Sequence, residues 1–336
     1  MKIFQNFDLK ERNTLGLKAI AKYYVEPTSI EELKSLLSDK SYEAVPKMVI
    51  GAGSNILFRG DYDGLIIHPS IKDIKILRED VNYIYVRAGA GVVWDKLVEY
   101  AVDRGWGGME NLSSIPGCTG AAPVQNIGAY GAEAKEIVFN VEYLCYDGAV
   151  EKSLSCEECR FGYRDSIFKR ELKGKGVITY VTFRLLKSPS LNTGYEDVKL
   201  ALKDVADPTI SQVRSAISSI RAKKLPDPTV VGNAGSFFKN PVVNKSLALQ
   251  LKELYQDLKL FPAGENAFKL PAAWLIDKCG FKGTRTGNVG VHANQALVLL
   301  AYEGATGEEL INLSKTIIET VKERFNVDIE PEVNIC

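Results

Sequence analysis

The sequence predicts an α+β fold. Strand-like and helix-like patterns come in clusters along the 336 residues rather than in strict alternation, which favours α+β over a doubly wound sheet. Alternating strand patterns dominate from about residue 70 to residue 185, and most of the predicted helices follow residue 207. A chain of this length is too long for one small core, so two or three domains are expected.

The first 69 residues predict one short helix among short buried strands. Ser29 followed by Glu32 forms a capping box that starts a helix running through Leu36. Strand-like apolar runs lie at 48–50, 56–58 and 65–67, and Asp61–Gly64 predicts a turn before the last of them.

Residues 70–206 predict mainly strands, at 74–77, 83–88, 138–146 and 176–185, with one helix over 92–102 that ends at Gly105. A long run of small and apolar residues, Ser113–Gly131, shows no regular pattern. A loop this long inside a compact domain is usually functional or disordered, and its apolar composition argues against disorder. We interpret it as the wall of a cofactor pocket.

The last third of the chain predicts mainly helices. Residues 187–207 are a candidate boundary or mobile excursion, after which Thr209 and Gln212 cap a helix with apolar residues at helical spacing. Further helices are expected at 247–258, 272–278 and 309–325, the last capped by Thr306, and strands at 296–301 and 327–335.

Composition narrows the class of protein. Hydrophobic residues make up 46% and charged residues 25% of the chain, which is typical of a soluble globular protein. Lys+Arg and Asp+Glu both count 42, which argues against binding nucleic acid or a membrane surface through bulk charge. There is no apolar run of signal-peptide type at the N-terminus and none long enough to span a bilayer, so we expect a cytoplasmic protein.

Cysteines and histidines do not predict a metal site. Six cysteines are scattered, and only the pair Cys156 and Cys159 has a suggestive spacing. A zinc site would need a second such pair or nearby histidines, and the chain has two histidines in all.

In the stretch Val230–Pro241, small residues lie next to one hydroxyl side chain, that of Ser236. The nucleophile-elbow pattern fails, because Ala234 and Phe238 stand where that pattern needs glycine. A nucleophilic serine also needs an adjacent base, which only the two histidines could supply. A hydroxyl that donates a proton and one that only caps a turn both remain open.

Each of three further features has two possible interpretations. The loop Gly51–Asn55 lacks the third glycine and the helix of a dinucleotide fingerprint, so it is either a phosphate nest or a tight turn. Arg164 beside Asp165 is either a group that polarises an anion or half of a structural pair. The cations of Arg221–Lys224 either complement a helix end or anchor a pyrophosphate.

Taken together, six stretches resemble the UDP-N-acetylenolpyruvoylglucosamine reductase (UDP-N-acetylmuramate dehydrogenase) family, in its subgroup with a substrate-loop tyrosine. They occur in family order across nearly the whole chain, which is far more specific than any one of them. The stretches are Gly51–Asn55, Ile115–Gly120, Gln125–Gly131, Phe161–Ser166, Gly232–Pro241 and Glu330–Val333.

The resemblance implies a two-lobed FAD-binding domain of the vanillyl-alcohol-oxidase (PCMH) type, with lobes at 1–69 and 70–206, and an α+β substrate-binding domain at 207–336. It implies a flavoprotein oxidoreductase that reduces UDP-N-acetylglucosamine enolpyruvate to UDP-N-acetylmuramate. This step serves peptidoglycan synthesis, and through it cell wall biogenesis, cell shape and cell division. Hydride would pass from NADPH to N5 of non-covalently bound FAD and then to C3, and a proton would reach C2.

The resemblance also assigns residues. Ser236 matches the proton donor, and Arg164 and Glu332 match the groups that stabilise the enolate-like intermediate. Positions expected to bind the cofactor are Gly51, Ala52, Gly53, Ser54, Asn55, Ser114, Ile115, Pro116, Gly117, Gly120, Ala121, Asn126, Gly128, Ala129 and Arg164. Positions expected to contact substrate are Tyr130, Tyr195, Lys224, Asn240 and Gln295.

The match departs from the family pattern at Phe261, which stands where such family members carry a substrate-contacting tyrosine. We expect a monomer whose partners are NADPH and the nucleotide-sugar substrate, without metal, nucleic acid or membrane. Two other functions compete with this one: a different flavin oxidoreductase or oxidase on the same fold, and a non-catalytic nucleotide-sugar sensor.

Overall fold

The computed structural model describes all residues from 1 to 336, and they form two compact units. The first unit comprises Met1–Phe7, Ala21–Ala52 and Tyr62–Lys223. The second comprises Asp8–Ile20, Gly53–Asp61 and Lys224–Cys336. Two short N-terminal segments therefore pack with the C-terminal third of the chain. No helix is both long enough and apolar enough to span a bilayer.

The first unit contains a four-stranded sheet in the order β1-β2-β5-β3, in which β2, β5 and β3 are parallel. Its strands are β1 (Ile3–Asp8), β2 (Ile20–Val25), β5 (Tyr62–Ile67) and β3 (Lys47–Val49). The predicted turn over 61–64 is wrong, because β5 begins at Tyr62, where it pairs with Ala21 of β2.

Helix α1 (Ile30–Ser38) connects β2 to β3, which lie on either side of β5, and parallel strands need such a crossover connection. The Ser29 hydroxyl accepts a 3.2 Å hydrogen bond from the Glu32 amide, so the predicted cap is confirmed. Leu33 and Leu36 belong to the same buried cluster as Leu65 and Ile67 of β5.

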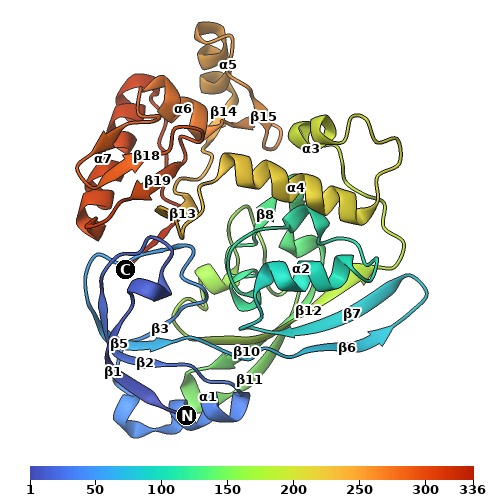
Figure 1. Cartoon of the computed structure of the whole chain (residues 1–336), viewed down its shortest axis with the longest axis vertical. Helices are drawn as coiled ribbons and strands as arrows, with labels where there is room; N and C mark the ends of the chain where they lie inside the picture. The colour runs from blue at the N-terminus through green and yellow to red at the C-terminus, as the bar shows by residue number, and fades with distance from the viewer. The chain divides into compact units, whose positions relative to one another are not determined.

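A second, antiparallel sheet of the first unit has the order β11-β10-β12-β7-β6 (Figure 1). Its strands are β11 (Glu151–Ser155), β10 (Val138–Cys145), β12 (Gly176–Leu186), β7 (Tyr83–Gly89) and β6 (Ile74–Glu79). Helix α2 (Trp94–Val102) packs Trp94, Leu97 and Val98 into the core of this sheet. Strands β6, β7, β10 and β12 were predicted, whereas the exposed strand β11 gave no apolar signal.

Helices α3 (Glu196–Ala201) and α4 (Ile210–Lys224) follow β12. The segment 187–207, expected to be a boundary or an excursion, thus holds one short helix, whose Val198 packs against Val213 and Ile217 of α4. The predicted cap of α4 is confirmed by bonds between Thr209 and Gln212. Through residue 223, α4 belongs to the first unit, although the predicted lobe boundary precedes it; the functional lobes stay a prediction.

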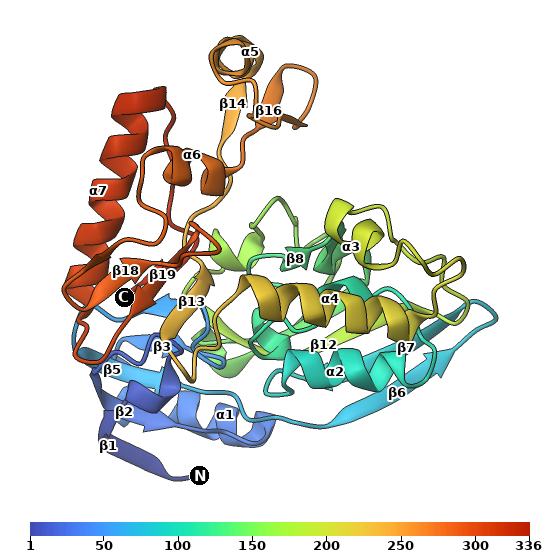
Figure 2. The same cartoon turned by 45° about the horizontal axis from the view of Figure 1, so that its top comes forward.

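The main sheet of the second unit has the order β13-β19-β18-β17. Its antiparallel strands are β13 (Gly232–Ser236), β19 (Val298–Ala301), β18 (Val289–Val291) and β17 (Arg285–Thr286). Helices α6 (Ala272–Lys278) and α7 (Gly307–Phe325) share its buried core, and Figure 2 shows α7 in red beside β18. The predicted Thr306 cap of α7 is a complete capping box with Glu309.

A smaller sheet in the order β14-β16-β15 carries α5 (Lys245–Leu254). Its strands are β14 (Val242–Asn244), β16 (Ala267–Lys269) and β15 (Phe261–Pro262). The predicted strand over 327–335 is wrong except for β20 (Asn334–Ile335), which pairs in parallel with β4 (Ile56–Leu57). Pro331 has no amide proton to donate to a ladder, and it makes only an isolated bridge with Phe238.

Candidate active site

Ser236 lies at the exposed end of β13 in the second unit. Phe237 and Phe238 follow it, and each is only 1% exposed, so the apolar core fixes the backbone directly after the hydroxyl. Gly235 precedes it at φ 67°, in the left-handed region, with open space where a side chain would point. The fold therefore presents the Ser236 hydroxyl from a rigid base.

Glu332 lies on the chain segment beside the end of β13. Its amide donates a 2.7 Å hydrogen bond to the Phe237 carbonyl, next to the bridge between Phe238 and Pro331. Its carbonyl oxygen accepts a bond from the Asn55 side chain at 3.4 Å. Two residues that the resemblance assigns to chemistry, distant in sequence, are thus neighbours in one unit.

Within the second unit, His292 is not placed to act as a base for Ser236. Val298 of β19 pairs with Ser236 on one side and accepts a hydrogen bond from the His292 amide on the other. Two strand spacings, roughly 10 Å, separate the backbones of Ser236 and His292. The other histidine, His68, belongs to the first unit, where its Nδ1 lies 3.0 Å from the Gly51 carbonyl oxygen. A Ser–His nucleophile is therefore excluded within the second unit.

Arg164 occupies a tight turn in the first unit, closed by hydrogen bonds between Gly162 and Asp165. Its φ of 54° is unusual for a residue with a side chain, and such backbone strain clusters at functional sites. Its Nη2 donates a 2.7 Å bond to the Gly128 carbonyl, whereas Asp165 forms an ion pair with Arg170 at 3.3 Å. The guanidinium group is thus held against the backbone of Gly128.

Strands β8 (Gly128–Ala129) and β9 (Ala132–Glu133) form a hairpin with a two-residue turn. The turn residues Tyr130 and Gly131 have φ values of 47° and 82°, which is the pattern of a type I′ turn. The Tyr130 ring contacts the Tyr195 ring edge to face, with centroids 5.3 Å apart. Two predicted substrate residues from distant parts of the chain therefore meet here.

Arg221 of α4 belongs to the same cluster. Burial raises the pKa of the Tyr130 hydroxyl, and the nearby positive charge of Arg221 opposes that rise. Burial lowers the pKa of Arg221 itself, and the charge of Arg164 lowers it further. The sequence alone left open whether Arg221 is part of a solvated helix end or an anion anchor. Its half-buried guanidinium, with Arg164 close by, suits an anionic group.

The loop Ser113–Gly131, expected to have no regular structure, in fact contains β8 and a 3₁₀ turn at Thr119–Ala121. Its first part is an arch tied to the start of α2, since the Trp94 amide donates to the Gly117 carbonyl at 3.0 Å. A Cβ placed on Gly51 would stand 3.5 Å from the Cys118 Cβ and 3.7 Å from the Ala121 Cβ. Two glycine- and alanine-rich segments thus lie against each other and expose backbone rather than bulky side chains.

These residues fit FAD. Close-lying glycine and alanine backbone can approach a flat ring and a pyrophosphate, and a nearby arginine cation can balance negative charge. Asn126 shapes this wall from inside: it is fully buried, and its amide nitrogen donates to Glu133 and to the Gly162 carbonyl, both at 3.0 Å. Its oxygen accepts from the Lys135 amide at 2.9 Å, so this side chain positions the loop.

The remaining predicted substrate residues, Lys224, Asn240 and Gln295, lie in the second unit and are half-buried. The Asn240 side-chain oxygen accepts the Ala272 amide at 2.9 Å and so caps helix α6. The Gln295 oxygen lies 3.4 Å from the Leu297 amide. Phe261, at the position of the expected tyrosine, is 46% exposed on β15.

The surroundings of Cys156 and Cys159 disfavour the thiolate form. Cys156 and Cys159 are both free thiols, and burial raises the pKa of both. Raised thiol pKa values oppose nucleophilic and redox chemistry, which require the thiolate.

Comparisons with known proteins cover the whole chain. Residues 21–153 match a family described as an FAD binding domain, and residues 227–336 match the C-terminal domain of UDP-N-acetylenolpyruvoylglucosamine reductase. A protein of that name from Flavobacterium johnsoniae is 44% identical, with 100% of each chain covered. Another from Amoebophilus asiaticus is 45% identical, covering 100% of this chain and 99% of the relative.

Among solved structures, the UDP-N-acetylenolpyruvylglucosamine reductase of Thermus caldophilus aligns over 99% of this chain and 98% of its own, with a TM-score of 0.68 at 22% identity. That likeness supports the fold: an FAD-binding domain of the PCMH type followed by a C-terminal α+β domain. The full-length sequence matches carry the family assignment. The chain belongs to the UDP-N-acetylenolpyruvoylglucosamine reductase family and is an FAD-dependent oxidoreductase.

Proposed function

We propose that this protein reduces UDP-N-acetylglucosamine enolpyruvate to UDP-N-acetylmuramate with NADPH, a step in peptidoglycan precursor synthesis in the cytoplasm. The names of the full-length relatives supply the substrate class. The observation that carries the proposal is that the Glu332 amide bonds to the carbonyl of Phe237, the residue directly after the exposed Ser236.

Ser236 donates a proton to C2 of the enolpyruvyl group. Reduction of the double bond at C3 leaves negative charge that spreads from C2 into the adjoining carboxylate, and an acid must quench it at C2. A positioned acid contributes about 10²–10⁴-fold to the rate. Arg164 and Glu332 stabilise this enolate-like charge, the arginine through a guanidinium group oriented by the Gly128 carbonyl.

FAD, when bound, supplies the N5 position that takes hydride from NADPH and delivers it to C3. The loop Gly51–Asn55 and the loop from Ser114 to Ala129 hold it, because their small residues let backbone amides reach its pyrophosphate and ring. Tyr130, Tyr195, Lys224, Asn240 and Gln295 contact the substrate. We propose that the protein acts as a monomer.

An anaerobic spectral titration tests the proposal. Purified protein should be yellow, NADPH should bleach the flavin, and UDP-N-acetylglucosamine enolpyruvate should restore the oxidised spectrum without oxygen. If only oxygen restores it, the protein is another flavin oxidase. If the protein is colourless, or NADPH does not bleach it, a non-catalytic sensor is the better interpretation.

A further inference from the structure

We infer that Asp95 is a positioning residue for the cofactor: with one face of α4, it fixes the backbone of Ser114 and thereby the arch formed by Ile115, Pro116 and Gly117. The inference rests on the proposal above that this arch contacts FAD. No feature of the sequence pointed to Asp95, which lies in the first turn of α2.

Asp95 links two elements that are far apart in the chain. Its Oδ1 accepts a 2.6 Å hydrogen bond from the Ser114 amide. Arg214 of α4 donates to both of its oxygens, from Nη1 at 2.7 Å and from Nη2 at 2.9 Å. Burial would raise the pKa of Asp95, but the bonds from Arg214 and Ser114 outweigh it and lower that pKa. The carboxylate is therefore ionised at neutral pH and oriented at both oxygens.

The other polar groups of Ser114 are held by the same helix. The Ser218 hydroxyl lies 2.8 Å from the Ser114 hydroxyl, and Arg221 donates from Nε to the Ser114 carbonyl at 3.0 Å. Arg214, Ser218 and Arg221 are spaced four and three residues apart, which places them on one face of α4. The amide, hydroxyl and carbonyl of one residue are thus all bonded to α2 and α4.

These bonds hold the Ser114 backbone in an unusual conformation, which packing alone does not explain. Ser114 has a φ of 56°, a conformation that residues with a side chain adopt reluctantly and keep only when their surroundings enforce it. If Ser114 relaxed to negative φ, the chain would leave it in another direction. The arch between Ser114 and the Trp94–Gly117 bond would then follow a different path. Asp95, Arg214, Ser218 and Arg221 thus form a clamp on Ser114. This clamp sets the shape of the proposed cofactor loop before FAD binds.

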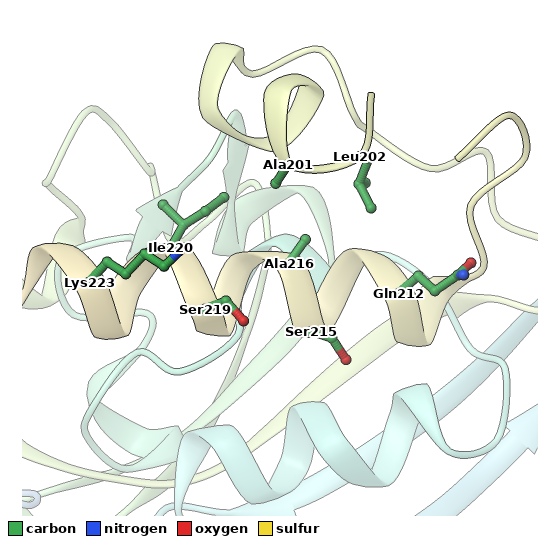
Figure 3. A pocket seen from close by; sticks show the side chains of 8 residues that line it. All are labelled: Ala201, Leu202, Gln212, Ser215, Ala216, Ser219, Ile220 and Lys223. Atoms are coloured by element: carbon green, nitrogen blue, oxygen red, sulfur yellow. The ribbon is translucent and has the colours of Figure 1, made fainter. Parts of the chain in front are cut away.

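The clamp residues of α4 do not line the groove between α4 and α3. Figure 3 shows the residues that line a groove of about 410 Å³ between α3 and α4, with Leu202 on the α3 side and Ala216 and Ser219 on α4. At 100° per residue, Ala216 and Ser219 project roughly opposite to Arg214, Ser218 and Arg221. Asp95→Ala and Arg214→Leu therefore change no residue that lines this groove.

The experiment measures FAD affinity directly. FAD is removed, and its dissociation constant for the apoprotein is measured by quenching of flavin fluorescence, together with the melting temperature of the apoprotein. We expect Asp95→Ala to weaken FAD binding at least 10-fold. Arg214→Leu leaves the acceptor for the Ser114 amide in place, so it should weaken FAD binding less than Asp95→Ala does. Lys96→Ala, which removes a surface ion pair with Glu99 on the same helix, is the matched control and should change nothing.

A second substitution separates positioning from general stabilisation. Glycine adopts positive φ without strain, so Ser114→Gly added to Asp95→Ala should recover part of the lost FAD affinity, without recovering the lost ion pair. If Asp95→Ala does not fold, Asp95→Asn with and without Ser114→Gly gives the same comparison. Unchanged FAD affinity in the Asp95 variant, or no recovery with Ser114→Gly, would overturn the inference. A wild-type protein that binds no FAD would instead contradict the proposed function.

Discussion

Replacing Ser236 with alanine should stop the chemistry and spare the fold. The structure shows no hydrogen bond from the Ser236 hydroxyl to the protein, and the residue is exposed at the end of β13. Exposed substitutions without such contacts change the free energy of unfolding by no more than about 0.5 kcal/mol. The melting temperature of Ser236→Ala should therefore match that of the wild type.

The loss of turnover follows from the role of a general acid. Losing a positioned acid costs about 10²–10⁴-fold in rate, which corresponds to roughly 2.7–5.4 kcal/mol of transition-state stabilisation. Flavin reduction by NADPH does not use this proton, so its rate should not change. The entire deficit should fall on the oxidative half-reaction with the enolpyruvyl substrate.

Stopped-flow absorbance separates the two half-reactions. NADPH is mixed with oxidised enzyme in one experiment, and substrate is mixed with the reduced enzyme under anaerobic conditions in the other. Ser246→Ala, an exposed serine of α5 in the same unit, is the control. Reoxidation by substrate within a few-fold of wild type in Ser236→Ala would refute the assignment of the proton donor.

Two predictions concern stability. Thr306→Ala removes the capping box of α7 and should lower the free energy of unfolding by about 0.5–2 kcal/mol, whereas Thr316→Ala, an exposed position inside the same helix, should cost less in urea titrations. Burial raises the pKa of Cys159 to about 12, so its contribution to stability is complete below the unfolded thiol pKa of about 8.5 and is lost as pH rises toward 12. Between pH 8 and pH 10, wild type should therefore lose about 1–2 kcal/mol more unfolding free energy than Cys159→Ala under reducing conditions; equal losses would show that the thiol ionises alike in both states.

Features governed by near neighbours in the chain were predictable. The caps at Ser29, Thr209 and Thr306 each depend on a partner three residues away, so the sequence displays both halves of the interaction. Hydrophobic periodicity predicts the buried strands β7, β10 and β12 and the amphipathic helix α4. The family motifs predicted the cofactor as well, because six stretches in family order resemble one enzyme family.

Features that depend on distant pairing were not predictable from local pattern. Strands β11, β17 and β20 are short or exposed, and partners elsewhere in the chain define them. The segments Asp8–Ile20 and Gly53–Asp61 join the C-terminal unit, although nothing in their composition separates them from their neighbours.

The sequence by itself determined the family, the cofactor and the identity of the candidate chemical groups, because these are properties of residue type and order. Only the tertiary structure decided that the Glu332 backbone lies next to Phe237, that Arg221 comes close to Tyr130, and that Asp95 holds the Ser114 amide. The physical reason is range: a hydrogen bond between residues far apart in the chain leaves no periodic trace in either local sequence. Such a bond forms only after apolar burial has brought its two segments together.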